Sequence, residues 1–204
     1  MDKTIQNSYI EPMARPKEFV RETALQRAIE VFCEHGYEGT STEVLLRAMG
    51  ISRQSMYDTF GDKRQLYLEA LQHYNTDSVA DLVRTLSGAP SPLKGLETVL
   101  LAFASKPAAD AALGCMGVGA ICEFGRSDPK VTVLTDSAGQ TLLSALEHSI
   151  AEAKRAGEIG ADVQMRPAAQ FIASTIAGLK ISARRGASPE ALRGIARMAI
   201  RSLR

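Results

Sequence analysis

A short polar segment of the chain has the residue types and the spacing of a surface that could contact nucleic acid. Its exposed side chains are predicted to be Arg53, Gln54, Ser55 and Tyr57. Met56 and Phe60 lie four residues apart and predict the buried side of a short helix. At about 100° per residue, Gln54 lies roughly 200° around the helix from Met56, so it faces away from that buried side. Arg suits guanine and Gln suits adenine by bidentate hydrogen bonding, although the two side chains could instead be merely solvated.

The preceding residues predict two short helices joined by a tight turn, a helix-turn-helix. Thr40 and Glu43 have the Ser/Thr-x-x-Glu spacing of a capping box, which predicts that the first helix begins at Thr40. Gly50 is expected to end this helix, because a left-handed residue is usual there, and Ser52 is expected to cap the second helix. The apolar stripe of the first helix is predicted to be Leu45, Leu46 and Met49.

The segment 39–66, GTSTEVLLRAMGISRQSMYDTFGDKRQL, resembles the operator-binding region of the tetracycline-repressor (TetR) family of transcriptional regulators. The residues that carry the resemblance are Thr40, Ser41, Leu45, Gly50, Ile51, Ser52, Tyr57, Phe60 and Lys63. Upstream, Gly36 and Tyr37 match the exit of the family's first helix. The sequence departs from the family pattern at Thr42, Met49 and Thr59. The resemblance implies an all-helical DNA-binding regulator.

The resemblance also implies which residues contact DNA. It assigns Thr40, Tyr57 and Lys63 to phosphates, and Lys63 would open a helix whose backbone N–H groups already favour an anion. Double-stranded operator DNA is therefore the expected partner. The complete predicted set of DNA-binding residues is Thr40, Ser41, Thr42, Ser52, Arg53, Gln54, Ser55, Tyr57 and Lys63.

Composition favours a soluble, all-α protein. Of the 204 residues, 45% are hydrophobic, 23% are charged and 5% are aromatic, and none is Trp. Apolar residues recur at helical spacing through most of the chain, whereas the alternation typical of strands is almost absent. The N-terminus has no signal pattern and the longest apolar run is too short to span a bilayer, so we expect a cytoplasmic protein with no membrane partner.

The residues that could ligate a metal are scattered along the chain. They are His35, His73, His148, Cys33, Cys115 and Cys122. They share no zinc-type spacing, and three cysteines cannot all pair with one another, which indicates a reducing compartment rather than a disulfide framework. We therefore expect no metal, no cofactor and no catalytic residue.

The chain is expected to fold as three zones with about nine helices. Residues 1–16 are polar and lack periodicity, which predicts a mobile arm. Residues 17–63 are expected to form the helix-turn-helix head, and residues 64–204 a larger helical body for ligand binding and dimerisation. The helices expected in the body are 63–86, one that starts near 92, 128–156, 167–185 and 189–203.

A glycine-rich segment, GCMGVGAICEFG at 114–125, admits two interpretations. Its glycines do not follow a phosphate-loop spacing, so they either let a helix pack closely or kink, or they form a wall of an inducer cavity. The second interpretation predicts a mostly apolar cavity and a hydrophobic small-molecule inducer. The predicted ligand-binding residues are Phe103, Cys115, Met116, Ile121, Phe124, Phe171 and Thr175.

Cys115 could be either a reactive thiol or a buried structural cysteine. A neighbouring Lys or Arg would stabilise a thiolate, and none lies near Cys115 in the sequence. This absence favours the structural interpretation.

In the family that the chain resembles, the last two helices pair with their copies across a two-fold axis, which implies a homodimer. The residues expected at that interface are Phe171, Ile172, Leu179, Leu192, Ile195 and Ala199. The resemblance then implies a repressor that a small molecule releases from its operator by shifting the helix 63–86. The alternative is a helical ligand-binding protein or small enzyme with a degenerate DNA-binding head.

Overall fold

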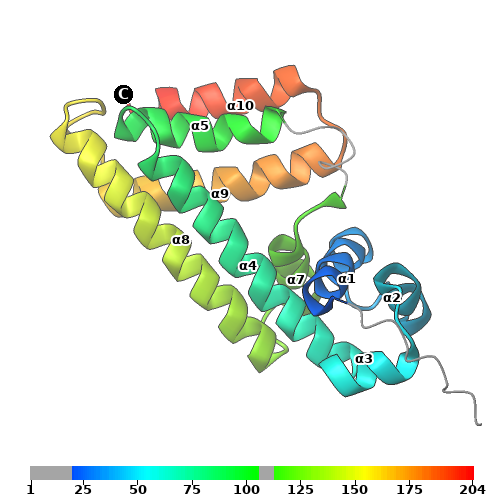
Figure 1. Cartoon of the computed structure of the whole chain (residues 1–204). Helices are drawn as coiled ribbons and strands as arrows, with labels where there is room; N and C mark the ends of the chain where they lie inside the picture. The colour runs from blue at the N-terminus through cyan, green and yellow to red at the C-terminus, as the bar shows by residue number, and fades with distance from the viewer. Residues whose placement is uncertain (1–19, 106–112) are drawn as a thin grey trace, which may run out of the picture.

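The computed structural model describes residues 20–105 and 113–204, and within them the chain forms nine helices and no strand. The helices are α1 (Arg21–His35), α2 (Thr42–Met49), α3 (Arg53–Phe60), α4 (Lys63–Ser87), α5 (Pro92–Ser105), α7 (Met116–Phe124), α8 (Pro129–Arg155), α9 (Met165–Arg184) and α10 (Pro189–Arg201). Figure 1 shows α1, α2 and α3 as a small head at one end of a larger helical body. The predicted all-α architecture is confirmed, while the predicted arm at 1–16 lies outside the described residues.

Serine hydroxyls cap the start of both short helices of the head, and a glycine ends the first of them. The Ser41 hydroxyl accepts the Val44 N–H at 3.3 Å and caps α2. Gly50 ends α2 with a left-handed backbone at φ 69°, a conformation that costs glycine little. The Ser52 hydroxyl accepts the Ser55 N–H at 3.0 Å and caps α3. The predicted roles of Gly50 and Ser52 are therefore confirmed.

The capping box predicted at Thr40 is wrong. Thr40 is only 1% exposed, and its hydroxyl donates to the Gly36 carbonyl oxygen at 2.6 Å. Because Thr40 is buried in the turn after α1, Ser41 is the first residue whose hydroxyl is free to cap α2. The helix therefore begins one residue later than a cap at Thr40 would place it.

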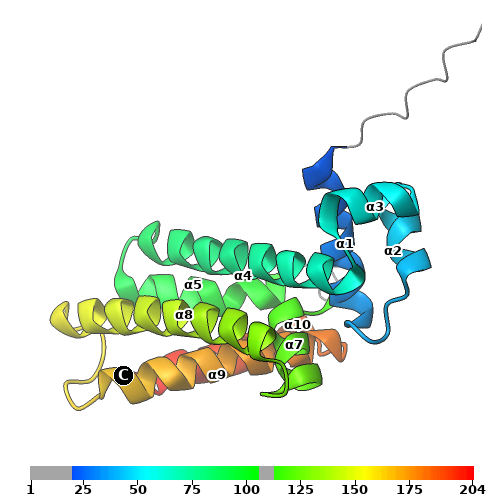
Figure 2. The ribbon, with the colours of Figure 1, turned by 90° about the horizontal axis from the view of Figure 1, so that it is seen from below.

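A long helix, α4, joins the head to the body. It starts with a capping box in which the Asp62 carboxylate accepts the Gln65 N–H at 2.8 Å and Gln65 accepts the Asp62 N–H at 3.2 Å. The helix then runs for 25 residues, from the head into the body, with α8 beside it for much of its length (Figure 2). Any movement of α4 in the body therefore reaches the head directly.

Buried side chains form two cores. The body core draws on the end of α4 and on α5, α8, α9 and α10. The head core draws on α1, α2, α3 and the first turns of α4, and it also contains Met116, Ala120 and Val131 from the body. The head is thus packed against α7 and the start of α8. None of the described helices is long and apolar enough to cross a lipid bilayer.

Candidate DNA-contacting surface and ligand cavity

Helix α3 has one buried and one exposed side, as its spacing predicts. Met56 is fully buried and Phe60 is 5% exposed, so both anchor the helix in the head core. Arg53, Gln54 and Tyr57 are exposed, with Tyr57 at 47%. Three of the four side chains predicted to contact DNA from this helix therefore lie on the surface of the head, and the fourth, Ser55, is half-buried.

Two of these exposed side chains are engaged with carboxylates of the head. Arg53 Nη2 lies 2.5 Å from a carboxylate oxygen of Glu43 on α2, and Gln54 Nε2 donates to Asp58 Oδ1 at 2.7 Å. The backbone amide of Glu43 and the Arg53 guanidinium hold the pKa of the Glu43 carboxyl below its usual range. A base edge or phosphate would have to replace these carboxylates to engage Arg53 or Gln54.

The small hydroxyl residues of the predicted set have different surroundings. Ser41 and Ser52 are exposed and cap α2 and α3, and the Ser52 and Ser55 hydroxyls lie 2.9 Å apart. Thr42 is half-buried at the start of α2. Thr40 does not lie with them on the surface, because its side chain is buried beneath the turn that follows α1.

The two basic residues at the start of α4 have different partners. The Lys63 ammonium lies 4.2 Å from the centre of the Tyr37 ring, a cation–π contact. Arg64 instead pairs with Asp128 at 2.5 Å, and Asp128 also accepts two backbone N–H groups as the cap of α8. The hydrogen bond from Arg64, together with those two amides, lowers the pKa of Asp128 to about 2. Arg64 thus ties α4 to α8.

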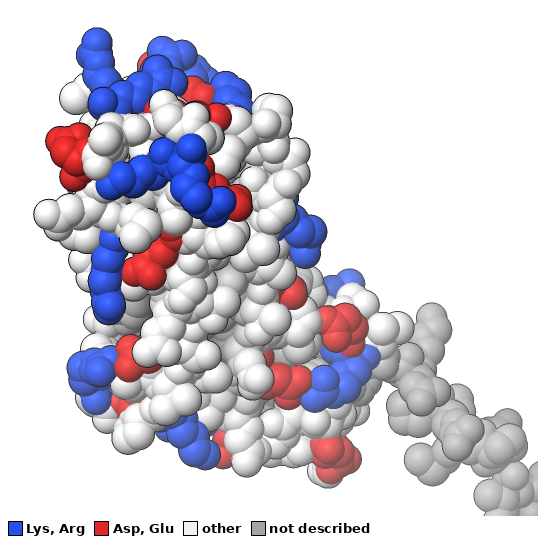
Figure 3. Space-filling view, turned by 90° about the vertical axis from the view of Figure 1, so that its left-hand side faces the viewer, with Lys and Arg blue, Asp and Glu red and all other residues white. Residues whose placement is uncertain are grey.

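Charge is mixed over one face of the molecule. On the face shown in Figure 3, Lys and Arg side chains gather at the end formed by α5 and α10, acidic side chains are interspersed with basic ones, and the middle is mostly uncharged. The described part of this face offers no broad basic surface.

A cavity of about 240 Å³ lies where α4, α7, α8 and α9 meet. Its lining residues are Tyr74, Asn75, Ser78, Val79, Cys115, Gly117, Val118, Ile121, Thr135, Ala138, Gly139, Leu142, Ala173, Ile176, Ala177 and Lys180. The structure thus brings together two of the predicted ligand residues, Cys115 and Ile121. It adds a lysine and a tyrosine to a lining that is otherwise mostly apolar, as the sequence predicts.

The other predicted ligand residues lie elsewhere. Met116 and Phe124 are on the side of α7 that packs in or against the head core, because a helix turns successive residues onto different faces. Phe103 packs against the body core. Phe171 is 45% exposed on α9, and the Thr175 hydroxyl donates to the Phe171 carbonyl oxygen at 2.8 Å.

Cys115 has a cationic neighbour that its sequence surroundings do not reveal. Lys180 of α9 lies 65 positions away in the sequence, yet its Nζ is 3.3 Å from Cys115 Sγ. Burial raises the pKa of the Cys115 thiol, but the charge of Lys180, the Tyr74 hydroxyl and the Val118 amide outweigh it, and the net pKa lies below the usual range. Cys115 is buried, as the favoured interpretation predicted, but the fold supplies the basic neighbour that its sequence surroundings lack.

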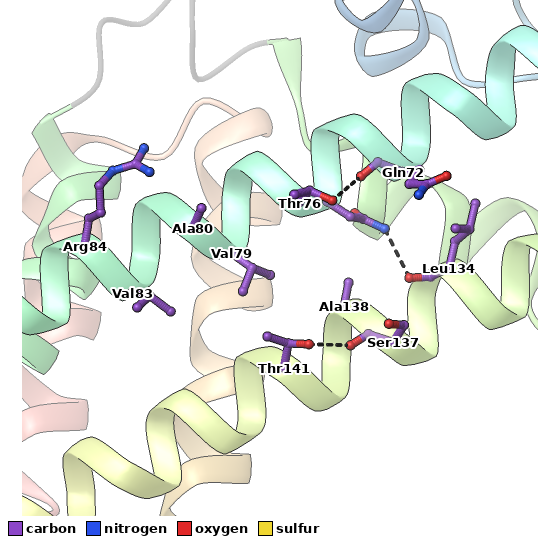
Figure 4. A pocket seen from close by; sticks show the side chains of 11 residues that line it. Gln72, Thr76, Val79, Ala80, Val83, Arg84, Leu134, Ser137, Ala138 and Thr141 are labelled. Carbon is purple, nitrogen blue, oxygen red and sulfur yellow. Dashed lines mark hydrogen bonds between the residues drawn. The ribbon is translucent and has the colours of Figure 1, made fainter.

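A second, outer cavity of about 580 Å³ lies between α4 and α8 (Figure 4). Asn75 Nδ2 crosses it to the Leu134 carbonyl oxygen at 3.4 Å. Asn75, Val79 and Ala138 line both cavities, so they form the wall between them. The sequence analysis did not foresee this groove, since it arises from the separation of two helices rather than from any motif.

Helix α7 connects the inner cavity to the head. Cys115 precedes its first turn and Gly117, Val118 and Ile121 face the cavity. At its other end the Glu123 carboxylate accepts the backbone N–H groups of two residues between α1 and α2, at 2.9 and 2.7 Å. These two residues are Tyr37 and Glu38.

An aromatic cluster reinforces this connection. The Phe124 ring centre lies 5.6 Å from those of both Tyr37 and Tyr67, and Tyr67 also meets Phe32 edge-to-face at 5.0 Å. A further link comes from α9, where Arg184 donates to the Glu34 carbonyl oxygen at 2.8 Å. The end of α1 is therefore held by α4, α7 and α9.

The residues predicted at a dimer interface divide into two groups. Phe171 and Ile195 are 45% and 41% exposed on α9 and α10, and the side chains of Met165, Ile181 and Met198 on the same two helices are also exposed. The other predicted residues are at most 4% exposed and belong to the body core: Ile172, Leu179, Leu192 and Ala199. For these four the expectation of a surface position is wrong, because α9 and α10 are apolar on two sides and one side packs within the chain.

Metal ligation has no evident site in the part of the chain that the structure describes. There, His, Cys, Asp and Glu side chains form no group of three that could hold a metal ion.

Two family models match the chain over its head and its body. Residues 24–70 match the model described as bacterial regulatory proteins, tetR family, and residues 91–199 match the one described as tetracyclin repressor-like, C-terminal domain. The first match covers the head and the start of α4, and the second runs from the start of α5 almost to the end of α10.

Individual relatives agree with these matches. The chain is 36% identical over 165 residues to the uncharacterized HTH-type transcriptional regulator YezE of Bacillus subtilis, covering 78% of this chain and 84% of that protein. It is 29% identical over 192 residues to the HTH-type transcriptional repressor ComR of Escherichia coli, covering 92% and 90%. It is also similar to a solved structure of a cysteine mutant of the TetR family regulator CifR complexed with 26-bp double-strand operator DNA. That similarity has a TM-score of 0.76 and 29% identity, and it covers 94% of this chain and 100% of that chain.

Proposed function

The chain belongs to the TetR family of DNA-binding transcriptional regulators, and we propose that it is a repressor that leaves its operator when a small molecule occupies the cavity beside Cys115. ComR, a relative along nearly the whole chain, is named a repressor, and CifR, another relative, is held with operator DNA in its solved structure. Release by a ligand is the mechanism that the inner cavity and its links to the head would serve.

The proposed DNA contacts lie on α3 and at the start of α4. Arg53 and Gln54 are the candidates for base edges, because both are exposed in the first turn of α3, and Gln54 also points away from the buried side of the helix. Tyr57 and Lys63 are the candidates for phosphates, with the hydroxyl residues Ser41, Thr42, Ser52 and Ser55 beside them. Thr40 is left out of this proposal because its hydroxyl is bonded inside the head.

The observation that carries the release mechanism is the position of α7. One face of this nine-residue helix borders the cavity. At its C-terminal end, Glu123 accepts hydrogen bonds from the backbone between α1 and α2. Helix α4 borders the same cavity at Tyr74 and Val79 and starts directly after α3. An occupant that favours a shifted position of α7 or α4 would therefore move the head.

A small movement of the head is sufficient for release in a dimer. Two recognition helices that read adjacent turns of DNA must lie about 34–36 Å apart. A ligand that alters this separation must bind the altered dimer more tightly than the DNA-binding dimer. The ratio of these two affinities sets how far the ligand can weaken DNA binding.

Substitution of one glycine in the cavity tests the proposal against a matched control. A Cβ on Gly117 would lie 3.0 Å from Asn75 Oδ1, inside the cavity, whereas one on Gly119 would meet no heavy atom of the described residues within 4 Å. The operator would first be selected from random double-stranded DNA. Its release would then be measured by gel shift with a panel of compounds small enough for about 240 Å³.

Gly117→Leu should bind the operator with nearly unchanged affinity and should no longer release it, because the leucine fills the cavity. Gly119→Leu, on the same helix, should respond like the wild type. If neither variant differs from the wild type, the ligand site lies elsewhere. Failure of the wild type to select any DNA sequence would instead favour the ligand-binding or enzyme alternative.

A further inference from the structure

The inner cavity has a cation in its lining and no carboxylate to pair with it. Lys180 reaches the cavity from α9, and none of the other described residues that line it is Asp, Glu, His or Arg. The described residues give the Lys180 ammonium one hydrogen-bond partner, Cys115 Sγ at 3.3 Å. An ammonium has three donors and a cysteine sulfur is a weak acceptor, so this contact leaves the ammonium able to bind an anion.

The surroundings of Lys180 increase the gain from such an anion. The side chain is half-buried, and most of the lining around it is aliphatic, with Val79, Val118 and Ile121 among its members. A charge in apolar surroundings is costly unless an opposite charge pairs with it. An anionic ligand therefore gains more from this cavity than a neutral ligand of the same shape.

Tyr74 adds a second donor beside the ammonium. Its hydroxyl interacts with the sulfur of Cys115, which Lys180 also contacts, so the two donors lie around one point of the cavity. The pKa of Tyr74 is raised, mainly by burial and then by the charge of Cys115, so the phenol keeps its proton and can donate it.

One ammonium and one hydroxyl suit a carboxylate better than a phosphate. A carboxylate has a single charge and two oxygens, which match one cation and a second donor. A phosphate has more charge and is usually bound by the fork of an Arg side chain, and the described lining has no Arg.

The outer groove offers space for an apolar tail. Only Asn75, Val79 and Ala138 are shared by the two cavities, and none of them is fully buried. Rotation of such side chains is a fast, local motion, so a chain can pass between the cavities without a change of fold.

This groove is less polar than its residue types suggest. The Thr76 and Thr141 hydroxyls donate to carbonyl oxygens of their own helices at 2.9 and 3.0 Å (Figure 4). Arg84, the charged residue of the described groove lining, already pairs with Asp81. The groove therefore suits the aliphatic part of a ligand, and the inner cavity suits its charged end.

We propose that the inner cavity binds medium-chain aliphatic monocarboxylates, with the carboxylate between Lys180 and Tyr74 and the tail directed past Ala138 into the outer groove. This inference rests on the proposed function and names the class of inducer. Binding is noncovalent, because the carboxylate replaces the sulfur of Cys115 as the partner of Lys180. Cys115 stays a neutral thiol in the complex, since two anions beside one ammonium repel each other.

The same exchange of partners would carry the signal to the head. The contact of Lys180 with Cys115 joins α9 to the residue before α7. A carboxylate that takes Lys180 breaks this contact and releases the start of α7. Glu123, at the other end of α7, holds the backbone of Tyr37 and Glu38 in the head.

Calorimetry with two matched probes tests the charged end without DNA. Octanoate and octanamide have the same chain length and differ in charge, and each would be titrated into the full chain at neutral pH. Octanoate should bind about tenfold to a hundredfold more tightly, as expected for a hydrogen-bonded charge. Lys180→Met should bind both probes alike, whereas Lys94→Met, which removes an exposed charge on α5, should keep the preference. Equal affinity of the wild type for both probes overturns the proposal, as does a preference that survives Lys180→Met.

A substitution of the cysteine separates carboxylate binding from thiol chemistry. Cys115→Ser should bind octanoate at least as tightly as the wild type, because serine does not ionise and so does not compete for Lys180. The mass of the wild type should be unchanged after incubation with octanoate. Loss of octanoate binding in Cys115→Ser contradicts the proposed exchange of partners.

A chain-length series tests the path of the tail. From butyrate through hexanoate to octanoate, wild-type affinity should rise about fourfold per added methylene. Ala138→Leu should weaken octanoate far more than butyrate, because the leucine blocks the wall between the cavities. Ser144→Leu, on α8 outside both linings, is the control and should leave the series unchanged. Equal weakening of butyrate and octanoate by Ala138→Leu overturns the proposed path.

Operator binding distinguishes this inference from the proposed function. Each variant is compared with its own ligand-free sample on the selected operator. Octanoate should release the wild type and Lys94→Met but not Lys180→Met. Selective octanoate binding without release supports the carboxylate site and refutes release through this cavity. A wild type that other compounds release, but that does not bind octanoate in calorimetry, overturns the carboxylate class and leaves the proposed function standing.

Discussion

At the exposed side of α3, both candidate base-reading residues already have a carboxylate partner. Arg53 lies 2.5 Å from Glu43, and Gln54 donates to Asp58 at 2.7 Å. On non-specific DNA, only phosphates can replace these carboxylates as hydrogen-bond partners. At the operator, the correct base pair can replace them with two hydrogen bonds to one side chain. The carboxylates therefore disfavour non-specific binding and leave sequence-specific binding less affected.

Substitutions of Arg53 and Lys63 should separate base contact from phosphate contact. Arg53→Ala should weaken operator binding by ~1–3 kcal/mol and leave binding to random DNA nearly unchanged, because a bidentate base contact is lost. Lys63→Ala should weaken binding to the operator and to random DNA alike. It should also lower the slope of log affinity against log salt concentration by about one, because one phosphate contact is lost. Affinities measured over a salt series on both DNAs decide this. Parallel losses on operator and random DNA for both variants would contradict the assignment.

At the scale of elements, α7 is the shortest connection between the cavity and the DNA-contacting head. Its middle borders the cavity, its buried side joins the head core, and its end holds the turn between α1 and α2. We expect a single helix with these three roles to transmit a displacement at one end to the other. Helix α4, which the sequence analysis predicted as the moving part, offers a second and longer route.

Glu123→Gln should loosen the contact between α7 and the head. The amide side chain is nearly isosteric but loses the charge that strengthens the two hydrogen bonds from Tyr37 and Glu38. Operator affinity should fall by roughly threefold to tenfold, and hydrogen exchange at residues 37 and 38 should become faster. Glu97→Gln on α5, which pairs only with Lys94 among the described contacts, is the control and should change neither quantity.

The ion pair between Arg64 and Asp128, which joins the start of α4 to the start of α8, should show itself in the pH dependence of stability. The pKa of Asp128 is lowered from 3.8 to about 2, so its stabilising effect is complete above about pH 4 and disappears as the pH falls through about 2. Urea unfolding at pH 6 should show Asp128→Asn less stable than the wild type, and the difference should shrink at pH 2.5. Asn can still cap α8, which isolates the ion pair. A difference that does not depend on pH would count against this account.

At the scale of the whole molecule, the described chain presents one α3 and leaves large apolar side chains of α9 and α10 exposed. These side chains, which we call the apolar face of the body, are Met165, Phe171, Ile181, Ile195 and Met198. Exposed apolar patches of this kind mark interaction surfaces, and a second copy of the chain would both cover the face and supply the second recognition helix. We therefore keep the homodimer as a proposal, built on this face rather than on the four buried residues first predicted.

Ile195→Glu should convert the dimer to a monomer. An unpaired charge buried in the interface costs roughly 3 kcal/mol, about a hundredfold in the dimer dissociation constant. Val133→Glu, on α8 and 66% exposed, is the matched control and should leave the dimer intact. Sedimentation velocity distinguishes the two, and operator affinity should fall only for Ile195→Glu. A wild type that sediments as a monomer would refute the proposal.

The sequence by itself determined most of the helices and the exposed side of α3. Caps at Ser52 and Gly50 act on backbone groups a few residues away, and the spacing of Met56 and Phe60 defines a face by helix geometry alone, so both can be deduced without knowing the fold. The expected helices of the body end within about two residues of the observed ones for the same reason.

Tertiary structure alone decided which faces meet. The contact of Lys180 with Cys115 joins residues 65 positions apart, and no periodicity within either helix predicts it. The same holds for Met116, which is turned into the head core, and for Ile172 and Leu179, which are buried within the chain instead of between copies. Helix periodicity shows that a face is apolar, but the partner of that face depends on how the helices pack, and packing is a property of the whole chain.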